Sequence, residues 1–397
     1  MLKSTANGTD LAQRIASSIR GRAPIARRFF DANAEAIAEA ARAVAERLSS
    51  GGRIYAFGRG AYATDAQHVA VEFVHPVLVG KPALPASDLS LSFEFSLPVI
   101  LTAHDVVVGF GPPDGDTAVS HALAEARALG AFTIALPGGE ADFATEPATA
   151  DEHVHQEIVE ITGHILYESV HVFLEHRQRN DDVGASAFLY PFLGGGPQPI
   201  VSVQASVAAS VREKAADAEA LRERVAMEEC DAIAAAVTTM AQELSAGGRL
   251  LLFGNGGSAT DATDWALDCV MPASGLAPIR ALSLAAEPAT ISAIANDVGR
   301  EYIFLRQLIA HVRPHDVVVA LSTSGGSLNV IATLEEARKR GNKTIALLGY
   351  DGGEILRRGL ADQAIVVRSD YIPRIQEAQG TIYHTMRRAI GWADDAA

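Results

Sequence analysis

Cysteine is nearly absent from this sequence. Cys230 and Cys269 are the only thiols among 397 residues, too few for a disulfide framework or for a zinc site built from thiolates. Such a composition is typical of a reducing compartment. We therefore expect a cytoplasmic protein.

Positive charge and long apolar stretches are also scarce. The chain has 33 Lys and Arg residues against 48 Asp and Glu, a net charge of −15, which argues against nucleic acid or an anionic membrane as the main partner. No apolar run approaches the roughly 18 to 20 residues of a membrane span, and the first residues lack the apolar core of a secretory signal. We therefore expect no nucleic acid and no membrane partner. An anionic substrate would need hydrogen-bond donors or positive charge at its binding site to offset the negative charge of the protein.

What the sequence does contain is an internal repeat. Residues 53–68 (RIYAFGRGAYATDAQH) reappear without a gap as residues 249–264 (RLLLFGNGGSATDATD), and HDVVVGF from His104 matches HDVVVAL from His315. A duplication of such long period predicts two homologous domains rather than a solenoid.

Each copy alternates short apolar runs with helical patterns. The runs are IYAF, VVVGF and FTIAL in the first copy, and LLLF, VVVAL and TIALL in the second. Continuous β-branched runs between helices predict parallel strands that are covered by helices on both faces. We therefore expect two α/β domains, 1–193 and 194–397, joined at the Gly- and Pro-rich stretch near 194–199.

Four motifs occur in order in the second copy. They are GNGGS at 254–258, AND at 295–297, STSGGS at 322–327, and RIQE at 374–377 followed by His384. In these motifs the chain resembles the sugar isomerase (SIS) domain family, and within it the phosphoheptose isomerases. The resemblance implies two tandem SIS domains, each a doubly wound, flavodoxin-like parallel sheet flanked by helices, and a phosphorylated sugar as substrate.

The STSGGS segment has the physical features of a phosphate site. Strand VVVAL runs into it and a helix follows near Leu328, so hydroxyl and backbone N–H groups meet at a helix N-terminus. Alone, the segment could be a Ser-rich helix cap; paired with GNGGS on a second strand-to-helix turn, it can face the same crevice. By resemblance, the substrate ligands are Asn255, Gly256, Gly257, Ser258, Asn296, Asp297, Ser322, Thr323, Ser324, Ser327 and Gln376.

The first copy has lost this loop. Its equivalent is GPPDGD at 111–116, where two prolines remove N–H donors and two aspartates would repel a phosphate. We expect that it binds no anion.

The first copy instead keeps a set of metal-type ligands. In phosphoheptose isomerases a His and a Glu one helical turn apart, with a later Gln and His, surround a metal, commonly zinc, and the Glu and the last His are the candidate base and acid. Here these positions are His68, Glu72, Gln156 and His164, a chemically reasonable zinc set. The alternative is that the two histidines are ordinary polar core residues.

In the second copy the same positions hold Asp264, Asp268, Gln376 and His384. Two carboxylates one turn apart repel each other unless a cation or a shared proton relieves them, so a second metal site or a raised pKa is one interpretation. A solvated helix face is the other.

The leading hypothesis is an aldose–ketose isomerase that acts on sedoheptulose 7-phosphate through an enediol. In a composite model, the phosphate loop of the second copy faces Glu72, His164 and the metal of the first. In a single-site model, the second copy holds everything, with Asp268 as base and His384 as acid. Because the family forms homotetramers, a homodimer of this chain could imitate four domains.

Two other functions remain open at this stage. The chain could be a non-catalytic sugar-phosphate sensor or an interaction scaffold, which the replacements at Asp264 and Asp268 favour. It could also be a tandem isomerase of the glucosamine 6-phosphate type, which explains the duplication but not the RIQE and GNGGS motifs.

Overall fold

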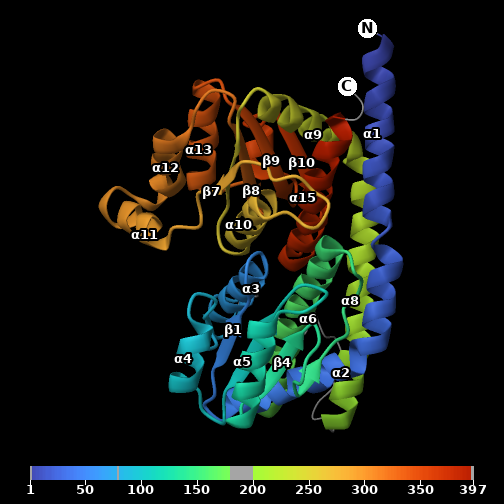
Figure 1. The fold of residues 1–397 in the computed structure, drawn as a ribbon, viewed down its shortest axis with the longest axis vertical. Coiled ribbons are helices and arrows are strands. Elements are labelled where there is room, and N and C mark those ends of the chain that lie inside the picture. The colour runs from blue at the N-terminus through green and yellow to red at the C-terminus, as the bar shows by residue number, and fades with distance from the viewer. Residues whose placement is uncertain (1, 78–79, 179–199, 395–397) are drawn as a thin grey trace. The chain divides into compact units, whose positions relative to one another are not determined.

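The computed structural model describes residues 2–77, 80–178 and 200–394. The chain divides into two compact units (Figure 1). Residues 23–217 make up one, called here the N-terminal unit, and residues 1–22 with 218–397 make up the other, the C-terminal unit. Among the described residues, none of the helices has the length and apolar content that crossing a bilayer requires.

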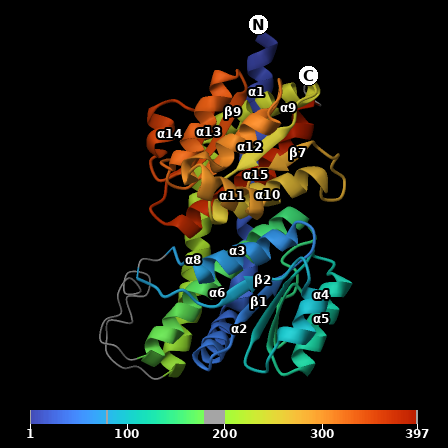
Figure 2. The same cartoon turned by 90° about the vertical axis from the view of Figure 1, so that its left-hand side faces the viewer.

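The N-terminal unit is built on five parallel strands in the order β2-β1-β3-β4-β5. The strands are β1 (Ile54–Phe57), β2 (Ala86–Asp88), β3 (Val106–Phe110), β4 (Phe132–Leu136) and β5 (Phe143–Ala144). The helices are α2 (Ala23–Ser49), α3 (Tyr62–Val74), α4 (Phe93–Ile100), α5 (Thr117–Ala128) and α6 (Glu152–Gln178). Helices α4 and α5 cover one face of the sheet (Figure 2), and α3 packs on α6 and on the strands.

The C-terminal unit repeats this plan with strands in the order β10-β9-β8-β6-β7, again all parallel. The strands are β6 (Leu250–Phe253), β7 (Ala281–Ser283), β8 (Val317–Ser322), β9 (Lys343–Gly349) and β10 (Gln363–Val367). The helices are α9 (Cys230–Ser245), α10 (Gly257–Val270), α11 (Pro288–Asp297), the 3₁₀ turn η2 (Arg300–Tyr302), α12 (Ile303–His311), α13 (Leu328–Lys339), α14 (Gly353–Arg357) and α15 (Ile372–Asp394).

Side-chain alternation along β6 shows why this unit has three layers. Leu250 and Leu252 join a core with α9, α10 and α15, whereas Leu251 and Phe253 join a second core with α12 and α13 on the opposite face. Successive strand residues point to opposite faces, so a run that is apolar throughout needs helices on both sides.

Both sheets therefore have the same topology when their strands are counted in chain order: second, first, third, fourth, fifth. This is the flavodoxin-like doubly wound order, and the predicted fold class is confirmed. In such sheets, ligands bind beyond the carboxyl ends of the strands where the order reverses, between the first and third strands. In the C-terminal unit that point lies between β6 and β8.

The division into units differs from the predicted domains 1–193 and 194–397. The predicted boundary near 194–199 lies outside the described residues. The compact units also exchange segments around it: α1 (Leu2–Arg20) belongs to the C-terminal unit, and the first part of α8 (Ile200–Glu228), up to Asp217, belongs to the N-terminal unit.

Packing explains this exchange. On α1, Leu11, Ile15 and Ile19 are buried in the core that α9 and α15 form. On α8, Arg212 donates a hydrogen bond to Glu35 of α2 at 2.7 Å. The repeat carries a helical pattern at the start of each copy, and a pattern does not say on which copy a helix packs.

The exchange predicts that a cavity in α1 weakens the C-terminal unit. Ile15→Ala should lower the free energy of unfolding of that unit by about 2 to 4 kcal/mol, because Ile15 is fully buried. The two tryptophans, Trp265 and Trp392, both lie in the C-terminal unit, so urea unfolding followed by tryptophan fluorescence measures it alone.

The matched control for this experiment is Ile37→Ala in α2, which is equally buried but belongs to the N-terminal unit. It should leave the tryptophan transition in place. Equal shifts for the two variants would contradict the assignment of α1.

Candidate functional site

The two Gly- and Ser-rich turns of the C-terminal unit lie side by side at the carboxyl ends of β6 and β8. Asn255, in the first turn, and Asn329, in the first turn of α13, exchange two amide hydrogen bonds: Asn255 Nδ2 donates to Asn329 Oδ1 at 3.0 Å, and Asn329 Nδ2 donates to Asn255 Oδ1 at 2.8 Å. The pair links the two turns, so GNGGS and STSGGS border the same edge of one sheet.

The backbone of these turns is tightly packed and requires glycine. A Cβ on Gly254 would lie 2.4 Å from the carbonyl oxygen of Ser258. Gly325 has a φ of +60°, and a Cβ there would lie 2.2 Å from the carbonyl oxygen of Gly352. Glycine alone tolerates both the close approach and the left-handed backbone.

The N-terminus of α13 is only partly satisfied from within the chain, where Asn329 Oδ1 accepts a hydrogen bond from Val330 N–H at 2.9 Å. Ser327 is its N-cap residue, but the Ser327 side chain makes no capping hydrogen bond. Ser322 is already committed, because its Oγ accepts a hydrogen bond from Gly325 N–H at 3.1 Å. Thr323 and Ser324 lie between them and are partly or fully exposed. The first N–H groups of a helix carry its positive dipole end and bind phosphate.

Asn296 and Asp297 were predicted to contact the substrate, and they lie at the exposed end of α11. Asn296 Nδ2 donates to the Asp297 carboxylate at 2.7 Å. Helix α11 packs mainly on α12 and η2. Their contact with a substrate stays a prediction.

In the N-terminal unit the equivalent helix, α5, is capped by a carboxylate of the chain itself. Asp116 is the N-cap residue of α5, and its carboxylate accepts hydrogen bonds from the N–H groups of Ala118 and Val119 at 2.8 and 3.0 Å. Arg59 approaches the same carboxylate at 3.9 Å. The helix end that would bind a phosphate is therefore already neutralised from within the chain.

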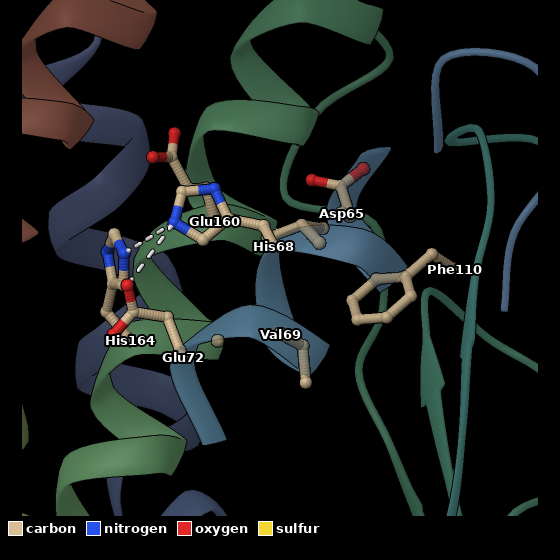
Figure 3. Close-up of a pocket in the computed structure, with 9 residues that line it drawn as sticks. Asp65, His68, Val69, Glu72, Phe110, Glu160 and His164 are labelled. Carbon is tan, nitrogen blue, oxygen red and sulfur yellow. Dashed lines mark hydrogen bonds and ion pairs between the residues drawn. The ribbon is translucent and has the colours of Figure 1, made fainter. Parts of the chain in front are cut away.

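The metal-type side chains of the N-terminal unit do converge (Figure 3). His68 and Glu72 come from α3 and His164 from α6, and the three side chains are 1 to 6% exposed. The Nε2 atoms of the two histidines are 3.2 Å apart, and Glu72 Oε1 lies 4.0 Å from His68 Nε2. Glu160 joins them, because its carboxylate and the two rings offer ligand atoms within 4.8 Å of one another.

This geometry suits a zinc ion. Two nitrogens bound at 2.0 to 2.1 Å in a tetrahedral site are roughly 3.3 Å apart. This is close to the 3.2 Å between the Nε2 atoms of His68 and His164. Glu72 Oε2 is buried and accepts no hydrogen bond from the residues that the structure describes, which is costly for a carboxylate unless a cation accompanies it. Gln156 is turned toward Asp65, to which its Nε2 donates at 3.0 Å.

The corresponding side chains of the C-terminal unit also meet. His384 Nε2 on α15 lies 3.2 Å from Asp268 Oδ2 and 3.4 Å from Asp264 Oδ2, both on α10. Tyr383 donates its hydroxyl to Asp264 at 2.7 Å. All three members of the cluster are 1 to 4% exposed, so the solvated face that the sequence left open is wrong.

Burial, and then the neighbouring Asp264 carboxylate, raise the pKa of Asp268 to about 6, while the hydrogen bond to His384 lowers it in part. Gln376, the fourth predicted member, is 2% exposed on α15, and its Oε1 accepts no hydrogen bond among the described residues. Three buried ligand groups within 4.8 Å of one another can hold a cation or share a proton.

Comparison with known proteins identifies the family. The family model described as SIS domain matches residues 20–138 and 215–349. The chain belongs to the SIS domain family. Both copies are thus SIS domains, as the motifs predicted, although the first keeps little of the motif set.

Curated relatives of this SIS protein include phosphoheptose isomerases. That of Citrifermentans bemidjiense is 44% identical over 154 residues, which cover 38% of this chain and 79% of the isomerase. That of Solidesulfovibrio magneticus is 39% identical over 175 residues, which cover 44% of this chain and 84% of the isomerase. The resemblance to this branch is confirmed.

Some solved structures match nearly the whole chain. The tagatose-6-phosphate ketose/aldose isomerase of Escherichia coli has a TM-score of 0.55 at 14% identity, covering 96% of this chain and 92% of its own. The C-terminal domain of glucosamine-fructose-6-phosphate aminotransferase from Francisella tularensis has a TM-score of 0.56 at 12% identity, covering 94% and 96%. At such identities the likeness concerns the fold alone.

Sequence reasoning missed several residues of these SIS clusters. Glu160 had a signal, because Gln156, Glu160 and His164 follow one another at four-residue intervals and so share a stripe of α6. Tyr383 had none, because an aromatic residue in an apolar helix is usually core. Asn329 had none either, because its partner Asn255 is distant in sequence.

The carboxylate of Asp116 should stabilise the N-terminal SIS unit. Asp116→Ala removes an N-cap and should lower the free energy of unfolding by about 1 kcal/mol, measured by urea denaturation with far-UV circular dichroism. The matched control is Asp114→Ala, two residues away and exposed, which should change stability by less than about 0.5 kcal/mol. Equal losses of stability in the two variants would show that Asp116 does not stabilise α5 as an N-cap.

Proposed function

We propose that the chain is a phosphosugar isomerase of the phosphoheptose isomerase type, with sedoheptulose 7-phosphate as its substrate. The observation that carries this proposal is the pair of turns joined by Asn255 and Asn329 beside the N-terminus of α13, where Ser327 makes no side-chain capping hydrogen bond. Together they form one anion site at the edge of the sheet where such folds bind ligands. The phosphoheptose isomerases among its relatives give the reaction class.

The predicted homodimer and cytoplasmic location stay predictions.

The reaction needs two proton transfers on neighbouring carbons. A base removes a proton from C1 of the ketose while an acid protonates the C2 carbonyl oxygen, which gives an enediol. The hydroxyl on C1 then loses its proton and C2 gains one, which gives the aldose. The phosphate group remains unchanged and serves to hold the substrate in register.

One candidate acid–base set lies in the C-terminal unit itself. Asp268 would be the base and His384 the acid, and they already lie 3.2 Å apart. A carboxyl whose pKa is raised to about 6 is better matched to proton transfer near neutral pH than an ordinary aspartate. Asp268 lies on α10, the helix that begins in the GNGGS turn, roughly 16 Å along the axis from Gly257.

The other candidate set lies in the N-terminal unit. Glu72 would be the base, and His68, Glu160 and His164 are the side chains that would hold a zinc ion. Gln156 could join them through its Oε1, since its Nε2 donates to Asp65. His164 would be the acid only while its Nε2 carries a proton rather than the metal. When bound, zinc would stabilise negative charge on the substrate oxygens as a Lewis acid. In this composite model, His68 orients Glu72 and the C-terminal unit supplies only the phosphate site.

A substitution that copies the first SIS domain into the second tests the phosphate site. By the repeat, Ser327 occupies the position of Asp116 (116 + 211 = 327, as for His104 and His315). Ser327→Asp should cap α13 and keep the protein folded, yet raise the KM for sedoheptulose 7-phosphate by at least about tenfold, because a carboxylate replaces the phosphate at the helix end.

Ser327→Thr is the matched control, since it keeps the hydroxyl and should leave the KM nearly unchanged. Steady-state kinetics measure both variants, and circular dichroism checks the fold. If Ser327→Asp had an unchanged KM, the phosphate site would be elsewhere.

Two isosteric substitutions decide between the acid–base sets. In the composite model, Glu72→Gln should lower kcat by about 100-fold or more and Asp268→Asn should lower it little; the single-site model predicts the reverse. Turnover is measured with zinc in excess. Loss with Asp268→Asn alone rules out the composite model, and loss with Glu72→Gln alone rules out the single-site model.

A non-catalytic sugar-phosphate sensor is the second candidate function. It is favoured by the replacement of His and Glu by Asp264 and Asp268, since Asp264 is engaged by both Tyr383 and His384 and so can serve the packing of α10 on α15. Binding of sedoheptulose 7-phosphate with no isomerisation, zinc added, would establish this function and overturn the enzyme.

A further inference from the structure

A pocket opens in the C-terminal unit at the edge of the sheet opposite the phosphate turns. Its walls come from the end of α9, the loop that precedes β7 and the last turns of α15, and Gly248, just before β6, lies at its base. The amino ends of β6 and β7 border it, whereas the GNGGS and STSGGS turns follow the carboxyl ends of β6 and β8. Its volume of about 510 Å³ is within the range of small-molecule sites.

Arg387 is the polar group that sets this pocket apart. It is 3% exposed and lines the pocket from α15. Its Nε donates to the carbonyl oxygen of Asp268 at 3.1 Å and its Nη2 to that of Ala277 at 2.5 Å. Its Nη1 makes no hydrogen bond within the described part of the chain, and no carboxylate there forms an ion pair with it.

A buried guanidinium needs compensation for its charge. The charge of Asp268 acts on Arg387 from beyond ion-pair distance, but the Asp268 carboxylate is engaged by His384. Backbone carbonyls satisfy two of the guanidinium nitrogens and leave the third for a ligand. An incoming carboxylate, sulfonate or phosphate would supply both the counter-charge and the acceptor.

The rest of the lining fits an anion that carries an apolar body. Arg280, held by a hydrogen bond from its Nη2 to the Gly247 carbonyl at 2.6 Å, brings a second guanidinium. Apolar side chains form the remaining walls: Ala241, Leu244, Leu276, Ile279 and Ile390. Gly391 leaves the α15 side open, since a Cβ there would meet nothing within 4 Å.

The duplicated domain shows that these cations are specific to the second copy. Strand pairing aligns Arg280 with Pro85, because Ala281 and Ala86 hold equivalent positions on β7 and β2. The helical register that aligns His384 with His164 aligns Arg387 with Tyr167. The first copy therefore has neither arginine, although the two sheets share one topology.

We propose that this pocket is a binding site for a small organic anion with an apolar body, separate from the sugar-phosphate site. Arg387 and Arg280 bind the anionic group, and the apolar walls bind the remainder. Because Arg387 also donates to the Asp268 carbonyl, the ligand would contact the residue that fastens the end of α10 to α15. The proposal does not depend on the isomerase activity.

The probe for this site is 1-anilinonaphthalene-8-sulfonate, which joins a sulfonate to an apolar ring system and fluoresces when its surroundings are apolar. Trp265 and Trp392 both lie in the C-terminal unit. When they are excited, energy transfer to the dye detects mainly the dye that is bound in that unit. We expect saturable binding of one dye per chain. Sedoheptulose 7-phosphate should not displace the dye.

Two variants test the pocket without touching the candidate acid–base residues. Gly391→Phe should abolish dye binding by filling the pocket, and the helix should tolerate it because glycine is a poor helix former. Arg280→Gln should weaken binding about tenfold through the lost charge-assisted contact. Arg313→Gln removes an exposed arginine of the same unit outside the pocket and should leave binding unchanged.

Tryptophan-detected unfolding confirms that each variant is folded. Unchanged dye affinity in both pocket variants would overturn the proposal. So would an equal loss with Arg313→Gln, displacement of the dye by sedoheptulose 7-phosphate, or the absence of saturable binding.

Discussion

The N-terminus of the helix after the third strand differs between the two SIS units, and our proposal for what each unit binds depends on this difference. In the N-terminal unit the Asp116 carboxylate accepts the hydrogen bonds of the first N–H groups of α5. In the C-terminal unit Ser327 stands at the same place, and its side chain makes no capping hydrogen bond to α13. A helix end can be neutralised by one anion at a time. The same fold therefore gives a helix capped by its own carboxylate in one copy and, in our proposal, an anion site in the other.

The remaining features are arranged around this difference. The first copy keeps a buried His68, Glu72 and His164 cluster whose spacing suits zinc. The second has Asp264 and Asp268 at the first two positions and keeps the histidine as His384, which contacts both aspartates; Tyr383 adds a hydrogen bond to Asp264.

Much of this could be predicted from the sequence, because the signals were local or repeated. Apolar strand runs and the duplication predicted two domains with parallel sheets covered on both faces, and the resemblance to SIS domains implied the doubly wound topology. The i, i+4 spacing of His68 and Glu72 placed them on one helix face. The helix exchange could not be predicted, since an amphipathic pattern does not name its partner. The Asn255–Asn329 pair and the Arg387 pocket could not be predicted either, because they depend on residues that are distant in sequence. Asn255 and Asn329 are 74 positions apart, and Arg387 and Asp268 are 119 positions apart.

The central claim is that each chain has one sugar-phosphate site, formed by the turns of the C-terminal unit. Isothermal titration of the purified protein with sedoheptulose 7-phosphate tests it most directly. The account predicts a stoichiometry of one per chain. A stoichiometry of two would show that the first copy also binds the phosphate and would contradict the claim.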